Sequence, residues 1–98
     1  MPYKVHVAKA VERKILSWGL PDEVLVEVHL RLRDHLPRDP LGLLERTRQP
    51  FDGMTYHFSL IDPKNRFCVH DCLFQVFFSQ DEEALEVKNG AYMRRVGL

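Results

Sequence analysis

The stretch FCVHDCLFQVFF, Phe67 to Phe78, decides how the rest of the chain is interpreted. It sets two cysteines around one histidine and then continues as an almost unbroken apolar run. A short apolar run that is rich in aromatic and β-branched residues is typical of a strand buried on both faces. The stretch therefore predicts the central strand of a small sheet. Whether the polar residues at its start, Cys68 to Cys72, form a metal or redox site is a separate question.

The spacing of these polar residues argues against a metal or redox site. On a strand, Cys68, His70 and Cys72 point the same way, but each lies about 6.6 Å from the next. Zinc ligands converge to about 2.0–2.3 Å from one ion, and a fourth ligand is required. The two cysteines would lie about 13 Å apart, beyond the limit of about 7 Å between the Cα atoms of a disulfide. A bulge at Asp71 would bend the strand without completing a ligand set. We expect free thiols, no metal and no cofactor.

The residues before this strand predict one strand and two helices. Tyr3–Val7 alternates apolar and polar residues, as a short strand does. From Ala8 to Trp18 the apolar residues recur at spacings of three and four, which predicts a helix that Gly19 ends. A second helix is expected from Pro21 to about His35, because the proline and the acidic residues after it suit a helix start.

The second half of the chain predicts a loop and three strands. The proline-rich loop contains one helical turn at Leu41–Arg46, and the strands are Met54–Ile61, Arg66–Ser79 and Ala84–Asn89. The order β-α-α-β-β-β makes residues 1–98 a single α+β domain, with a helical hairpin packed on a small, mainly antiparallel sheet. The expected core consists of Val11, Ile15, Trp18, Leu25, Val28, Leu32, Phe58, Phe74, Val76 and Phe78.

Two apolar residues of the second helix, Val26 and Leu30, fall off its buried stripe and one turn apart. They either widen the core or form an exposed ridge to which a partner docks. We expect this ridge to be the partner-binding surface.

The composition limits the function classes. The chain has 98 residues, with 14 basic residues balanced by 14 acidic ones. Residues 1–49 have a net charge of +2 and residues 50–98 of −2, so neither half has the strong positive charge that is typical of nucleic-acid-binding domains. No apolar run approaches the roughly 20 residues of a membrane helix, and the first residues lack the apolar region of a signal peptide. With two cysteines, this composition predicts a cytoplasmic protein without membrane contact.

His70 and His57 are the histidines available as an acid or base near neutral pH. His70 stands beside Asp71, but adjacent strand residues point to opposite faces and cannot form a dyad. The alternative for His70 is a structural histidine, hydrogen-bonded at a bend of the strand.

The order of elements resembles the RelE/ParE toxin superfamily of bacterial toxin–antitoxin systems. The resemblance covers nearly the whole chain and includes an L-x-x-x-P loop from Leu36 to Pro40. The segments that carry it are YKVHVAKAVERKILSW, GMTYHFSLID, LFQVFFSQDEEALEV and AYMRR.

The resemblance implies an antitoxin-like partner and two kinds of target. RelE-type members cut messenger RNA on the ribosome, whereas ParE-type members poison gyrase. Carried over to this chain, the catalytic residues would be Arg66, His70, Tyr92 and Arg94, with Arg95 beside them.

Members that cleave RNA are usually strongly basic, whereas this chain is neutral and carries Gln75 where many relatives have arginine. We therefore expect a toxin-like protein that is degenerate or not a nuclease. The alternatives are a ribosome-dependent endoribonuclease and an unrelated α+β interaction domain.

Overall fold

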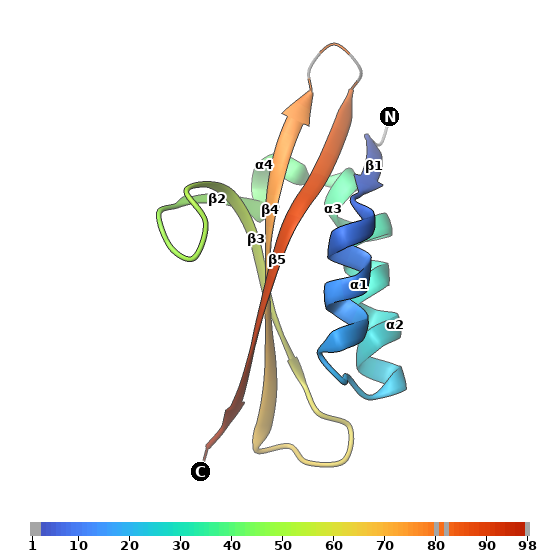
Figure 1. Ribbon diagram of the computed structural model, residues 1–98, viewed down its shortest axis with the longest axis vertical. Helices are drawn as coiled ribbons and strands as arrows, with labels where there is room; N and C mark the ends of the chain where they lie inside the picture. The colour runs from blue at the N-terminus through green and yellow to red at the C-terminus, as the bar shows by residue number, and fades with distance from the viewer. Residues whose placement is uncertain (1–2, 80, 82, 98) are drawn as a thin grey trace.

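The computed structural model describes residues 3–79, 81 and 83–97, which form a five-stranded sheet with helices packed on one face (Figure 1). The strands are β1 (Lys4–Val7), β2 (Leu44–Thr47), β3 (Gly53–Ile61), β4 (Cys68–Ser79) and β5 (Ala84–Val96). Their order across the sheet is β1-β5-β4-β3-β2. β1 runs parallel to β5, and the other neighbours are antiparallel. The α+β class with a mainly antiparallel sheet is confirmed.

The helical layer is the expected hairpin, α1 (Lys9–Ser17) and α2 (Asp22–Leu30). Gly19 follows α1 with φ +65, a conformation that side-chain-bearing residues rarely adopt, and this ends the helix. After α2 the chain continues through a π-helical turn, η1 (Arg31–His35), and two short helices, α3 (Leu36–Arg38) and α4 (Pro40–Leu43). None of the helices in the described residues is long and apolar enough to cross a membrane.

The core lies between the helices and β4, as the sequence predicts. Phe74 is completely buried at its centre, with the rings of Trp18 and Phe58 at 5.8 and 5.9 Å. Trp18 and Leu25, both expected in the core, are partly buried at its margin. The buried residues include Val11, Ile15, Val24, Val28, Leu32, Leu36, Tyr56, Phe58, Leu60, Phe74, Val76, Leu85 and Val87.

The prediction for Phe78 is wrong, because this side chain is 43% exposed. Phe78 pairs with Leu85 near the tip of the β4–β5 hairpin, which extends past the helices (Figure 1). There the ring of Tyr3 packs edge-on against it, at 5.2 Å between centroids. The apolar pattern places the residue on the covered side but does not show where the cover ends.

The last strand does not stop at Asn89 but continues to Val96. Asparagine followed by glycine reads as a turn, yet Gly90 lies inside β5 opposite Phe74. A Cβ atom at Gly90 would come within 3.2 Å of the Phe74 ring and 3.4 Å of Trp18. Close packing therefore favours a glycine at position 90, and Gly90 does not end the strand. This correction places Arg94 and Arg95 on β5 instead of beyond the sheet.

Two smaller expectations also fail. The helical turn expected at Leu41–Arg46 is α4, Pro40–Leu43: Asp39 caps its start by accepting the Gly42 N–H, and the helix ends because Leu44 is already extended in β2. β4 pairs regularly through Asp71, and its irregularity lies between Gln75 and Val76. No bulge at Asp71 is needed, because that carboxylate has its own partners on the open face.

Candidate functional site

A chain of hydrogen bonds joins Asp62, His70 and Tyr92 at the far end of the covered face from the hairpin tip. His70 Nε2 lies 2.9 Å from an Asp62 carboxylate oxygen, and His70 Nδ1 lies 2.6 Å from the Tyr92 hydroxyl. His70 is only 3% exposed. Because the carboxylate accepts from Nε2, the neutral ring leaves Nδ1 to accept from Tyr92. His70 is thus a hydrogen-bonded structural histidine, but its partners lie in the β3–β4 connection and on β5, and β4 pairs regularly at this point.

Aromatic packing fixes the orientation of this group. The Tyr92 ring stacks on His70 on one side, at 5.8 Å between centroids, and on Trp18, at 5.3 Å. Trp18 stands at the end of α1, so the helical layer holds the phenol in place. Burial raises the pKa of Tyr92, and the bond from His70 lowers the pKa of Asp62. Tyr92 therefore stays protonated near neutral pH and serves as a hydrogen-bond donor.

Cys68 and Arg94 extend the group on the same face. The Arg94 Nε donates to the Cys68 sulfur at 3.1 Å, and Cys68 is completely buried. The other thiol, Cys72, lies between Phe58 and Tyr92 in the sheet register, and burial raises its pKa to about 12. The two cysteines are free thiols in different surroundings: Cys68 faces polar partners, whereas Cys72 belongs to the apolar core.

The open face of the sheet holds a second polar group, centred on Asp71. This carboxylate is 7% exposed and accepts hydrogen bonds from Ser59 and from the Nε and Nη2 of Arg95. The Nε2 of His57 lies 3.8 Å from the same carboxylate. Arg95, followed by Ser59, holds the pKa of Asp71 down at about 2 against the opposing effect of burial. Asp71 is therefore ionised and neutralises the positive charge beside it.

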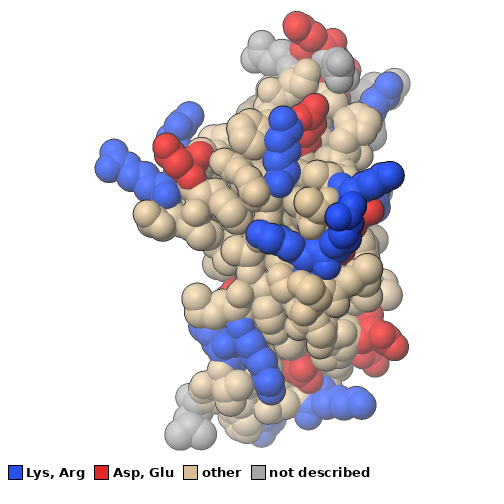
Figure 2. All heavy atoms as spheres, in the orientation of Figure 1, with Lys and Arg blue, Asp and Glu red and all other residues tan. Residues whose placement is uncertain are grey.

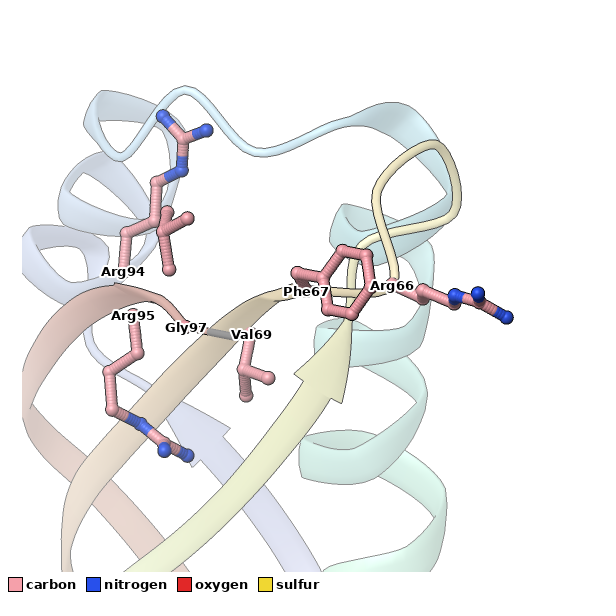
Figure 3. A pocket seen from close by; sticks show the side chains of 7 residues that line it. Arg66, Phe67, Val69, Arg94, Arg95 and Gly97 are labelled. Atoms are coloured by element: carbon pink, nitrogen blue, oxygen red, sulfur yellow. The ribbon is translucent and has the colours of Figure 1, made fainter.

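The structure brings together only part of the predicted catalytic set. His70 and Tyr92 meet, and Arg94 joins them through Cys68. Arg66 does not join them. It lines an open hollow of about 630 Å³ together with Phe67, Val69, Arg94, Arg95, Val96 and Gly97. Figure 3 shows Arg94 and Arg95 leaving β5 in opposite directions, and Arg66 pointing away from both.

The predicted catalytic groups do not all share one concave surface: Arg66, Arg94 and Arg95 line the open hollow, whereas His70 and Tyr92 are not part of its lining. The Asp62–His70–Tyr92 group faces the helices, whereas the Asp71 group faces the other side of the sheet. Figure 2 shows basic and acidic side chains interspersed over one face of the molecule, without a continuous basic field. A larger hollow of about 740 Å³ at the β2–β3 connection is lined by Arg46, Thr47, Arg48 and Asp52, none of which belongs to either group.

Sequence reasoning missed the partners that complete both groups. Asp62 reads as turn chemistry, and Ser59 as one of the polar residues on the open side of a half-buried strand. The pairing of β3 with β4 is the signal that could have identified these partners. The turn at Asp62–Asn65 sets the β3–β4 register, and in that register Ser59 faces Asp71. Val26 and Leu30, the predicted partner-binding residues, lie on the exposed side of α2, where they are 67% and 42% exposed.

Comparisons with known proteins bear on the fold. No protein-family model matches the sequence, and no curated protein matches it either. Among solved structures, the chain is similar to one from the toxin–antitoxin complex RelBE2 of Mycobacterium tuberculosis, with a TM-score of 0.62 and 18% sequence identity. The match covers 95% of this chain and all of the other. Over nearly its whole length, the chain has a RelE-like fold.

Proposed function

We propose that the chain is the toxin-like component of a toxin–antitoxin pair, which binds an antitoxin-like protein and acts by binding its target, without cutting RNA. The observation that carries this proposal is the RelE-like fold over 95% of the chain, shared with a structure that is itself a toxin–antitoxin complex. Two features of the molecular surface support this proposal, one for the partner and one against RNA cleavage.

The outer side of α2 supports a protein partner. Val24, Val28 and Leu32 face the core, with exposed fractions of 3% or less. At 100° per residue, Val26 and Leu30 lie about 180° away from that stripe. A helix that is apolar on both sides is typical of one that is covered on both sides. We infer that an apolar helix or strand of the antitoxin-like partner packs on Val26 and Leu30.

The cations support binding over cleavage. An endoribonuclease must stabilise additional negative charge as the 2′-oxygen attacks phosphorus, which needs several converging donors. Arg66, Arg94 and Arg95 line one open hollow, but Arg95 is paired with Asp71, Arg94 donates to Cys68, and the Arg66 side chain points away from both. His70 has both ring nitrogens engaged inside the fold. Any residual ribonuclease activity would depend on Arg66, His70, Tyr92 and Arg94.

The partner is tested by co-expression with the product of each adjacent reading frame. We expect one of these products to co-purify with the parent chain and with Leu16→Lys. Leu16, on α1, is 68% exposed, so this variant is a matched control. The double variant Val26→Lys/Leu30→Lys should stay folded and lose the partner. Retained binding would place the docking surface elsewhere, and failure of both adjacent products to bind the parent would overturn the pairing.

The mode of action is tested by expressing the chain without its partner in a bacterial host. We expect no codon-phased cleavage when message ends are mapped on ribosomes. Cleavage in phase with codons, abolished by Arg66→Ala and by Arg94→Ala, would establish the endoribonuclease alternative instead. Growth arrest with double-strand DNA breaks and intact messages would identify gyrase as the target.

A further inference from the structure

Three side chains of different chemistry converge at the junction of the β3–β4 connection and β4. They are the carboxylate of Asp62, the thiol of Cys68 and the imidazole of His70, and their ligand atoms all lie within 4.8 Å of one another. Cys68 and His70 are buried, and Asp62 is partly exposed at the rim. The three residues offer an oxygen, a sulfur and a nitrogen, which are the three donor types that zinc accepts in proteins.

We propose that Asp62, Cys68 and His70 bind a zinc ion, with a fourth position left for water. This inference is independent of the toxin-like role proposed above. It also opposes the expectation from sequence, which considered Cys72 as the second sulfur ligand and left Asp62 out. The spacing argument against Cys72 still holds, because Cys72 lies within the apolar core.

The backbone holds the three ligands in place before any ion arrives. The Asp62 N–H donates to the Cys68 carbonyl at 2.9 Å, and the Cys68 N–H donates to the Asn65 carbonyl at 2.9 Å. The carboxylate of Asp62 also accepts the Lys64 N–H at 2.8 Å. These bonds close the connection into a tight loop, so that Asp62 stays beside Cys68 at the start of β4. A preformed loop lowers the entropic cost of assembling a site.

The adjustment that an ion requires is small. Tetrahedral zinc with bonds of about 2.0–2.3 Å places its ligand atoms about 3.3–3.8 Å from one another. The Asp62 oxygen and His70 Nε2 are 2.9 Å apart and must separate slightly. The atoms that are now up to 4.8 Å apart must close by about 1 Å, which a change of side-chain torsion can supply.

The surrounding groups suit this role. The Arg94 Nε donates to the Cys68 sulfur at 3.1 Å, so a cation lies beside a ligand that is anionic when it binds metal. When zinc occupies Nε2 of His70, the ring proton moves to Nδ1 and is donated to the Tyr92 oxygen, which already lies 2.6 Å away. Such an outer hydrogen bond fixes the orientation of a ligating histidine. Binding then releases one proton, from the Cys68 thiol, and involves no change in oxidation state.

The test is a titration of the chelator-treated protein with cobalt(II), followed by zinc. We expect the parent to show, at stoichiometric cobalt, the thiolate-to-cobalt charge-transfer absorption and the strong visible bands of a tetrahedral site, and zinc to abolish both. Cys72→Ser should behave like the parent, whereas Cys68→Ser should show no charge-transfer band. Tyr92→Phe should bind about tenfold more weakly, as loss of an outer-sphere partner does.

Several outcomes would overturn the proposal. These are a parent without the charge-transfer band, a band that persists in Cys68→Ser, and a band that is lost in folded Cys72→Ser. If circular dichroism shows that Cys68→Ser is unfolded, Asp62→Asn decides, because it changes a residue at the rim of the fold. Unchanged cobalt affinity in that variant would show that Asp62 is not a ligand and would overturn the proposed site.

Discussion

His70 and Asp71 are neighbours on β4, yet their side chains belong to different environments. His70 lies under the helices in a chain of hydrogen bonds with Asp62 and Tyr92. Asp71 lies on the open face, and Ser59 and Arg95 bury it. The pleat of a strand sends adjacent residues to opposite faces, which keeps the two groups apart. A polar group can therefore be buried either by the helical layer packed above it or by its own hydrogen-bond partners.

Truncation of the central aromatic residue should give the largest effect on the covered face. Phe74→Ala removes a completely buried ring that packs against Trp18 and Phe58, and we expect it to lower the free energy of unfolding by about 3–5 kcal/mol. Leu73→Ala, one residue away and half-buried on the open face, should cost about 1 kcal/mol. Urea denaturation of both variants gives the comparison, and equal losses would show that the open face is covered in solution.

Removal of a histidine should also separate the two faces. His70→Ala leaves Asp62 and Tyr92 without their shared partner, and we expect a loss of about 2 kcal/mol in the free energy of unfolding. His57→Ala should change it by less than about 0.5 kcal/mol, since that side chain is 51% exposed and 3.8 Å from Asp71. A comparable loss for His57 would mean that its pairing with Asp71 is stronger than the geometry indicates.

The acid dependence of stability should report on Asp71. Its pKa is lowered from 3.8 to about 2 in the folded protein. The folded state therefore favours the ionised carboxylate, and this contribution is complete above about pH 4 and lost as the pH falls towards about 2. Asp71→Asn should lose about 1–2 kcal/mol at neutral pH and show a flatter acid limb.

Thermal unfolding between pH 2 and pH 7 measures the acid limb. Asp52→Asn, which changes an exposed carboxylate, is the control and should retain the limb of the parent. A parent-like limb in Asp71→Asn would assign the acid sensitivity to a different group.

Much of the fold follows from local pattern. The apolar run from Phe67 to Phe78 and Gly19 after the first helix each act within a few residues, and the structure confirms the central strand and the helix end that they predict. The end of β5 could not be predicted in this way. In the sequence, Gly90 looks like the end of a strand. The structure gives a different reason for a glycine at this position: the rings of Phe74 and Trp18, which are far away in the sequence, leave little room for a side chain.

The candidate site was predictable only in part for the same reason. His70 and Tyr92 could be selected as residue types, but their contact depends on the β4–β5 register, which pairs Cys72 with Tyr92. Arg94 and Arg95 point to opposite faces because side chains alternate along a strand, and this could not be predicted while the strand was expected to end at Asn89. Whether a cation is available to a ligand depends on partners such as Asp71, which lie far away in the sequence.

The sheet has a different number of strands at its two ends. β1 pairs with β5 only over Ala84–Val87, and β2 pairs with β3 only over Gly53–Tyr56. In the described part of the chain, the rest of β5 and β3 therefore pair with β4 and have no strand on their outer side. Backbone groups that stay unpaired along such margins can pair with an extended chain, and in a concentrated sample the nearest one belongs to another copy. Concentration, as well as pH, should therefore govern how the isolated protein behaves in solution.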